Sequence, residues 1–209
     1  MRRVAWLSGV VAVLTLLLGT TPARATLITV EPDDFSGGTD ISNAFPGVTL
    51  VAIDQADLAV YSLEDSIDDS AQASTGTRIF GNSDVQYPWE WGAAFNAGMR
   101  AEFSRPVSFV AIDIIGNDLL DQGRLIAFDG FDTALATYET GLLSAGQFET
   151  ASISRPTTDI AYVVATSVNE FESVSLDHMQ FRVPEPGTLL LLGSGLAVLG
   201  LLHRRRRKP

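Results

Sequence analysis

Between residues 26 and 183 the sequence consists of short apolar or alternating runs, separated by Gly, Pro, Asn and Asp. The alternation of apolar and polar side chains is clearest at 148–153 and 174–181. A period of two residues is typical of a β-strand with one buried face. No stretch of this region combines a 3.6-residue period with helix caps, so we predict strands and no long helix.

Eleven segments have the length and composition of strands. They are 27–30, 48–53, 58–63, 77–80, 98–103, 107–115, 124–128, 134–140, 147–154, 159–166 and 173–181. Strands that recur every 8–15 residues favour two antiparallel sheets packed face to face. The fold class predicted for 26–183 is therefore an all-β antiparallel sandwich, and its length suits one domain with an adequate core.

The first 25 residues have the features of a signal peptide. Arg2 and Arg3 form a basic start, residues 4–18 are apolar, and Ala23-Arg24-Ala25 supplies an A-x-A cleavage site. We predict removal of 1–25 by signal peptidase, with a mature chain that begins at Thr26. An uncleaved anchor is the alternative, but the apolar run is short for one.

The last 26 residues, 184–209, combine three features in a fixed order. Val183-Pro184-Glu185-Pro186-Gly187-Thr188 precedes an uncharged run at 188–202, and five basic residues lie within 203–209. As a helix this run would be ~22 Å long, against a hydrocarbon core of ~30 Å, so we predict a transmembrane helix that is short for a permanent span. The basic cluster favours the cytoplasmic side, and the prolines favour an extended segment outside the membrane.

This arrangement resembles the PEP-CTERM sorting signal of Gram-negative bacteria. The resemblance implies that Pro184, Glu185 and Pro186 form the sorting motif. It also implies cleavage by an exosortase, with a precursor anchored in the inner membrane and a mature protein at the cell surface or in the extracellular matrix. An ordinary C-terminal anchor is the alternative, although it has no need for two prolines and a short helix.

The charge of the middle region differs from that of the termini. Residues 26–183 contain 24 Asp and Glu, six Arg and no Lys, a net charge of −18. Such a domain avoids nucleic acid and anionic membranes, because both are polyanions, and it attracts divalent cations. Solubility alone would explain the charge equally well.

The absence of cysteine excludes a thiol nucleophile and Cys-ligated metal sites. His178 is the only histidine of 26–183, so a Ser-His-Asp triad would depend on it, and no Gly-x-Ser-x-Gly sequence is present.

The segments 107–115, 125–129, 159–164 and 174–181 resemble those of PEP-CTERM ectodomains and, more loosely, of jelly-roll domains of the galactose-binding-like type. In such jelly rolls a structural calcium ion often joins an early loop to a carboxylate on the last strand. The acidic segment with Asp33, Asp34 and Asp40, together with Asp177, fits that arrangement, because Ca²⁺ prefers oxygen ligands. A solvated acidic turn is the alternative.

Tyr87, Trp89 and Trp91 form an aromatic segment around Pro88 and Glu90. Flat aromatic faces pack against the apolar C–H faces of sugar rings, so these three residues are candidates for carbohydrate binding. Alternatively, at least one indole fills the core.

Carboxylate pairs for glycoside hydrolysis are available in Asp113 with Asp118 or Asp121, but a chain with so many acids will always contain some pair. We therefore expect an exported, surface- or matrix-associated protein that is not an enzyme. Its ectodomain would recognise extracellular polysaccharide, and no nucleic acid. The alternatives are a secreted glycan-active hydrolase and a purely structural matrix component.

Overall fold

The computed structural model describes residues 25–53, 59–64, 73–82, 91–92, 98–117, 120–169 and 173–183. Within these ranges the chain forms strands and one short 3-10 helix. In chain order they are β1 (Thr26–Val30), η1 (Pro32–Asp34), β2 (Thr39–Asp40), β3 (Val48–Ile53), β4 (Tyr61–Glu64), β5 (Arg78–Gly81), β6 (Trp91–Gly92), β7 (Gly98–Val107), β8 (Phe109–Gly116), β9 (Gly123–Phe128), β10 (Ala134–Glu139), β11 (Phe148–Ser154), β12 (Ile160–Ser167) and β13 (Ser173–Val183).

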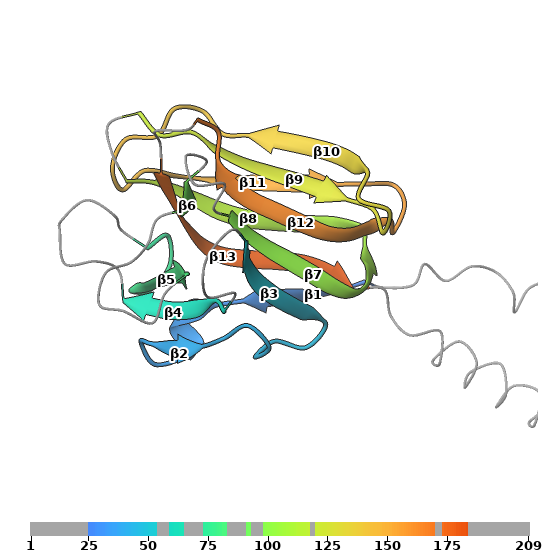
Figure 1. Cartoon of the computed structure of the whole chain (residues 1–209), viewed down its shortest axis with the longest axis horizontal. Helices are drawn as coiled ribbons and strands as arrows, with labels where there is room; N and C mark the ends of the chain where they lie inside the picture. The colour runs from blue at the N-terminus through green and yellow to red at the C-terminus, as the bar shows by residue number, and fades with distance from the viewer. Residues whose placement is uncertain are drawn as a thin grey trace, which may run out of the picture. The chain divides into compact units, whose positions relative to one another are not determined.

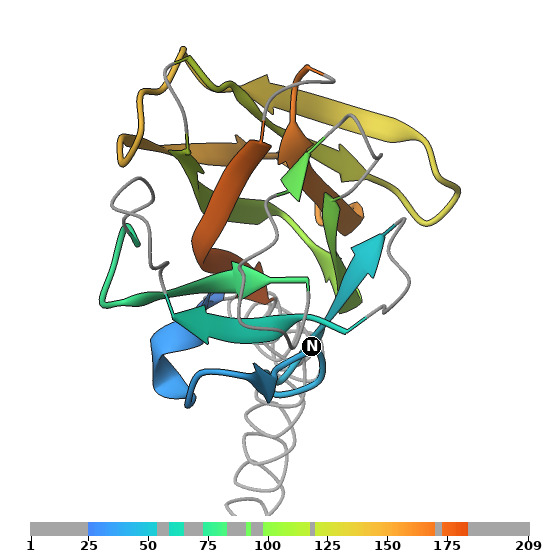
Figure 2. The ribbon, with the colours of Figure 1, turned by 60° about the vertical axis from the view of Figure 1, so that its left-hand side comes forward.

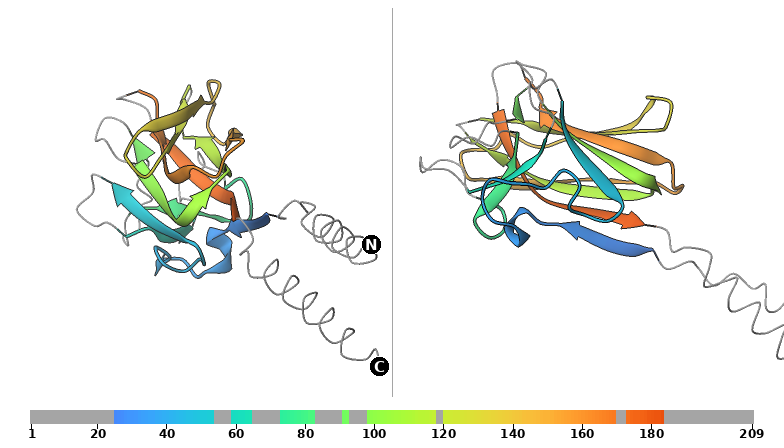
Figure 3. Two further views of the ribbon diagram at one scale, coloured as in Figure 1. Left: turned by 90° about the vertical axis from the view of Figure 1, so that its right-hand side faces the viewer. Right: turned by 60° about the horizontal axis from the view of Figure 1, so that its bottom comes forward.

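The strands form two sheets (Figure 1). One has the order β11-β8-β13-β5-β4-β2, with β1 and β6 also paired to β13, and the other has the order β10-β9-β12-β7-β3. Neighbouring strands pair antiparallel in both sheets. Figure 3 shows the two layers from two further sides. The architecture is therefore an antiparallel β-sandwich.

The alternation of side chains decides which face of each strand is buried. In β3 and β9 every second residue is buried, including Leu50, Ala52, Leu125 and Ala127. The residues between them lie on the outer face of the five-stranded sheet and remain partly exposed. Because successive side chains of a strand point to opposite faces, one apolar set fills the core and the other set forms a surface.

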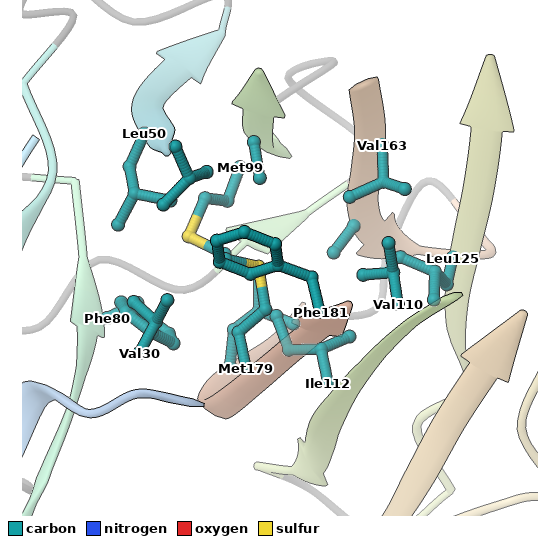
Figure 4. Packing of buried hydrophobic residues seen from close by; sticks show 14 of the residues in the cluster. Val30, Leu50, Phe80, Met99, Val110, Ile112, Leu125, Val163, Met179 and Phe181 are labelled. Atoms are coloured by element: carbon teal, nitrogen blue, oxygen red, sulfur yellow. The ribbon is translucent and has the colours of Figure 1, made fainter. Parts of the chain in front are cut away.

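The core lies between the sheets and takes side chains from both of them. Phe181 of β13 is fully buried, and its ring centroid lies 5.0 Å from that of Phe103 of β7. In the view of Figure 4, Phe181 lies between Leu125 and Val163 of the five-stranded sheet and Phe80 of β5. Core and sheets belong to one compact unit, Thr26–Val183.

Strand β13 is the central strand of the larger sheet. It pairs with β8 on one side and with β1, β5 and β6 on the other. Its register against β8 shifts between Asp177 and Gln180, where His178 has a positive φ of 42°. A β-bulge of this kind inserts an extra residue and redirects the neighbouring side chains.

The predicted all-β sandwich is confirmed, and each of the eleven predicted segments overlaps a strand. The two-residue strands β2 and β6 and the helix η1 were not predicted, because elements this short have no detectable period. No helix in the described ranges is long and apolar enough to cross a bilayer. The predicted signal peptide (1–25, described only at Ala25) and the predicted helix at 188–202 lie outside the described residues.

Candidate functional site

Two groups of side chains stand out in the sandwich: a buried polar cluster beneath the 73–77 loop, and an aromatic group on the outer face of the five-stranded sheet. The first contains two of the predicted calcium ligands, and the second was not predicted from the sequence.

The polar cluster is built around two buried carboxyl groups. Asp113 of β8 and Asp177 of β13 occupy paired positions and are 5% and 0% exposed. The Ser74 hydroxyl lies 2.8 Å from Asp113 Oδ2 and 2.9 Å from Asp177 Oδ2. The Ser74 hydroxyl therefore bridges the two strands, with one carboxylate oxygen of each strand within hydrogen-bond distance. Burial, the largest effect, raises the pKa of Asp177 to about 6.

Hydrogen bonds from the 73–77 loop hold the N-terminal segment to this cluster. The backbone N–H of Thr75 donates to Asp177 Oδ2 (3.0 Å), and the Thr75 hydroxyl lies 3.0 Å from Glu31 Oε2. The backbone N–H of Thr77 donates to Asp33 Oδ1 (2.9 Å). The loop thus connects the segment after β1 to the middle of β13.

The predicted calcium ligands divide between this cluster and the surface. Asp33 and Asp177 contact the same loop, through Thr77 and Thr75. Asp34 is exposed, and Asp40 accepts a hydrogen bond from the N–H of Ser42 (2.9 Å), which stabilises its own turn. In the described part of the chain no three Asp, Glu, His or Cys side chains are grouped so that they could hold a metal ion. Calcium binding stays a prediction.

His178, which any catalytic triad would require, has both ring nitrogens engaged. Nδ1 lies 2.7 Å from Glu31 Oε2, and Nε2 lies 2.8 Å from the Gln180 side-chain nitrogen. These contacts fix the imidazole between β13 and the segment after β1.

The second group follows one row of paired residues across the five-stranded sheet. Tyr162 of β12 pairs with Phe128 of β9 on one side and with Glu102 of β7 on the other, and Thr49 of β3 pairs with Glu102. The row spans three inter-strand spacings, ~14 Å. The side chains of Thr49, Glu102 and Phe128 point away from the core, because they alternate with buried residues. Tyr162 is only 9% exposed, because Phe128 and Arg100 both pack against its ring.

Aromatic and cationic groups stack along this row. The rings of Phe128 and Tyr162 are nearly parallel, 9° apart, with centroids separated by 4.7 Å. The Arg100 guanidinium carbon lies 3.8 Å from the centroid of Tyr162, in a cation–π contact. Arg100 Nε also lies 2.9 Å from Glu102 Oε1, although the angle is not that of a hydrogen bond. This pair is too exposed to stabilise the fold much, and its effect is to orient both side chains.

The turn between β9 and β10 lies beside this row and carries Phe131, which at 91% is the most exposed aromatic residue in the described part of the chain. Figure 2 shows the β9–β10 hairpin on the right-hand side of the sandwich. Asp129 Oδ1 accepts the N–H groups of Phe131 (2.8 Å) and Thr133 (2.9 Å). The hydrogen bond from the Thr133 N–H, together with the one from the Phe131 N–H, lowers the pKa of the Asp129 carboxyl group.

Tyr162 attaches this turn to the sheet. Its hydroxyl donates to Asp132 Oδ1 (2.9 Å), and Asp132 has a positive φ of 61°. Burial, together with this hydrogen bond, raises the pKa of Tyr162. We refer to Phe128, Phe131, Tyr162, Arg100, Asp132 and Glu102 as the aromatic strip.

A pocket of about 330 Å³ lies at the β3 end of the row, and its polar lining is Asn43, Thr49, Glu102 and Ser104. Because Thr49 and Glu102 belong to both the row and the pocket, the aromatic strip and the pocket are continuous.

The predicted carbohydrate-binding residues are not part of the described surface. Tyr87 and Trp89 lie outside the described residues, and of Trp91 only the backbone is described, which pairs with Val174 of β13. The aromatic strip was missed because its members occur singly, each within an ordinary strand or turn. One sequence signal was available: Phe131 lies in the turn-forming segment Asp129-Gly130-Phe131-Asp132, where a large apolar side chain is unexpected.

Comparison with protein families bears on the C-terminal end. Residues 182–207 match the family described as the PEP-CTERM protein-sorting motif. The chain carries a PEP-CTERM sorting signal. The match includes Pro184, Glu185 and Pro186, and a PEP-CTERM signal implies an exported precursor that is anchored in the membrane. The predicted resemblance is confirmed.

A search among curated proteins found no significant relative. Several solved structures show similarity to the sandwich. They include the K2 cleaved adhesin domain of Lys-gingipain (14% identity, TM-score 0.48, covering 76% of this chain and 100% of that one). The CBM22-1 xylan-binding domain of Paenibacillus barcinonensis Xyn10C has 11% identity and a TM-score of 0.44, covering 79% and 99% of the two chains. A family 6 carbohydrate-binding module has 12% identity and a TM-score of 0.35, covering 78% and 100%. These similarities assign no ligand to the PEP-CTERM protein.

Proposed function

We propose that this PEP-CTERM protein is an exported, non-enzymatic component of the cell surface or extracellular matrix, whose sandwich binds polysaccharide. The observation that supports export most directly is the sorting signal at 182–207, which begins at the end of strand β13. In this proposal signal peptidase removes 1–25, and an exosortase-type enzyme cleaves near Pro184, Glu185 and Pro186.

The position of the signal is compatible with cleavage after folding. Phe181 is the last fully buried residue of the core, and the strand that carries it ends at Val183. Cleavage within 184–186 removes no core residue, so we expect the released domain to be as stable as the domain in the precursor.

The aromatic strip supports polysaccharide binding. Sugar rings have apolar C–H faces and polar hydroxyl rims, and a surface that binds them combines aromatic side chains with carboxylates or guanidinium groups. The strip combines the stacked rings of Phe128 and Tyr162 with Asp132, Glu102 and Arg100, and Phe131 is 91% exposed in the adjacent turn.

The positions of the buried acids argue against glycoside hydrolysis. That reaction needs two carboxyl groups that face the substrate from opposite sides of the scissile bond. Asp113 and Asp121 are 5% and 3% exposed, and Asp121 accepts a hydrogen bond from the N–H of Asn117 (2.7 Å). The remaining candidate, Asp118, lies outside the described residues.

The proposal is tested on the protein recovered from its native cells. We expect the intact mass to correspond to a chain that begins at Thr26 and lacks the basic end. A variant with Pro184, Glu185 and Pro186 all replaced by Ala is expected to keep its C-terminus and to remain in the membrane fraction. A native protein that retains both ends would refute the proposed processing.

The activity of the sandwich is tested with the fragment 26–183, which contains the complete core. Incubation with polysaccharides is expected to give saturable binding without release of reducing ends. Release of products would identify a hydrolase, and a domain that neither binds nor cleaves would identify a purely structural matrix component.

A further inference from the structure

We infer that the aromatic strip is a preformed binding site for an uncharged polysaccharide chain, with Phe131 as its outermost contact. This inference rests on the proposed function and specifies the site and the class of glycan.

The first argument is the exposure of Phe131 in an ordered turn. The side chain is 91% exposed, so the fold gains almost nothing from its apolar surface. Nevertheless the turn is held by hydrogen bonds at two points: Asp129 accepts two backbone N–H groups, and Asp132 accepts the Tyr162 hydroxyl. A turn whose backbone is already held in place is favourable for binding, because little backbone entropy is lost when a ligand packs on the exposed ring that it carries.

The second argument is the continuity of the surface. The Tyr162 hydroxyl donates a hydrogen bond to Asp132 in the turn. The Tyr162 ring stacks on Phe128 and makes a cation–π contact with the Arg100 guanidinium. The row then continues through Glu102 and Thr49 into the pocket beside β3. A surface that extends over several strands suits a chain of linked sugars better than a single small molecule.

The polar groups along the strip are suited to hydroxyl groups. Asp132 and Glu102 offer carboxylate oxygens as acceptors, and the Arg100 guanidinium offers donors. Asp132 accepts the Tyr162 hydroxyl, and Arg100 contacts both Glu102 and the Tyr162 ring, so the three polar groups are held along the strip.

Charge decides the class of ligand. The strip contains two carboxylates and one cation, and the domain around it has a net charge of −18. Uronate-rich polysaccharides, nucleic acids and anionic membranes would all be repelled by this field. An uncharged glycan is not repelled, and its apolar ring faces match the aromatic side chains.

The experiment is affinity electrophoresis of fragment 26–183 in gels that contain xylan, mixed-linkage β-glucan, galactomannan or polygalacturonate. The polysaccharide extracted from the native matrix is included as a fifth gel. We expect at least one of the neutral glycans to retard the domain, and we expect polygalacturonate to leave it unretarded.

Three variants test whether the polysaccharide binds to the aromatic strip. Phe131→Ala is expected to weaken retardation by about tenfold, the loss of one well-packed aromatic contact. Tyr162→Phe keeps the stack but releases Asp132, and we expect an intermediate loss. Phe148→Ala removes a 50% exposed ring from β11 in the other sheet, and it is the matched control that should bind as the original does. The thermal midpoint of each variant is measured in parallel to confirm that it is folded.

The outcomes separate this inference from the proposed function. Equal binding by Phe131→Ala and the original would overturn the site while leaving polysaccharide binding intact. Strong binding to polygalacturonate would overturn the class of glycan. A domain that is retarded in none of the five gels would refute both this inference and the proposed binding.

Discussion

Asp177 is a carboxyl group that the fold removes completely from water. Its folded pKa is about 6, above the ~3.9 of an unfolded chain, so the folded protein holds the proton more tightly. The associated stability is fully present below pH ~4 and is lost as the pH rises through 6.

We therefore expect Asp177→Asn, which is neutral at every pH, to gain stability relative to the original domain as the pH rises. The difference should change by on the order of 2 kcal/mol between pH 4.5 and 7.5, measured by urea unfolding. Asp159→Asn is the control: Arg155 lowers the pKa of Asp159 to about 2, so Asp159 stays ionised throughout this window. If the difference in the free energy of unfolding between Asp177→Asn and the original domain did not change with pH, the raised pKa of Asp177 would be contradicted.

A substitution at Gly76 tests the contact between Asp33 and the 73–77 loop. Its φ is +55°, and a Cβ there would lie 2.1 Å from the Asp33 carboxylate. Gly38 has a similar φ of +78° but open space around it, so Gly38→Ala measures the backbone strain alone. We expect Gly76→Ala to lower the thermal midpoint more than Gly38→Ala, because the added methyl group displaces Asp33 from the N–H of Thr77. Equal decreases in the thermal midpoint for Gly76→Ala and Gly38→Ala would show that the Asp33 side chain can move aside without loss of stability.

At the scale of elements, β13 places a fully buried aromatic ring in the core. Phe181 is fully buried against Phe103, whereas Phe148 of β11 is 50% exposed. Removal of a buried aromatic ring costs about 3–5 kcal/mol, and that of a surface ring much less. We expect Phe181→Ala to lower the free energy of unfolding by about this amount and Phe148→Ala by under ~1 kcal/mol, measured in urea. Similar losses for the two would show that β13 is not central to the core.

The strands themselves were predictable, because a buried face repeats every two residues whatever the partner strand. The alternation at 148–153 and 174–181 located β11 and β13. The bulge at Asp177–Gln180 was not predictable, since it depends on the register against β8. The aromatic strip was missed for a related reason: Phe128 and Tyr162 are far apart in sequence, and only the pairing of β9 with β12 stacks them.

At the scale of the whole domain, the excess of negative charge is the dominant property. Like charges repel in the folded state, and salt screens them over ~8–10 Å at 0.1–0.15 M. We expect the thermal midpoint of 26–183 to rise with NaCl concentration. The predicted calcium site makes a separate claim: CaCl₂ at matched ionic strength should raise the midpoint further, and Asp33→Asn should remove that extra increase. Identical curves for the two salts would refute the calcium prediction.

The terminal position of β13 has a mechanical consequence. A chain tethered through the residues after Val183 transmits any pull directly into this strand. Because β8 holds one side of β13 and β1 holds the other, with Thr26 opposite Val183, a load along the strand is shared between two hydrogen-bond ladders. A pulling force applied after Val183 would therefore act on a strand that is paired on both sides, and unfolding from this end would require both ladders to break.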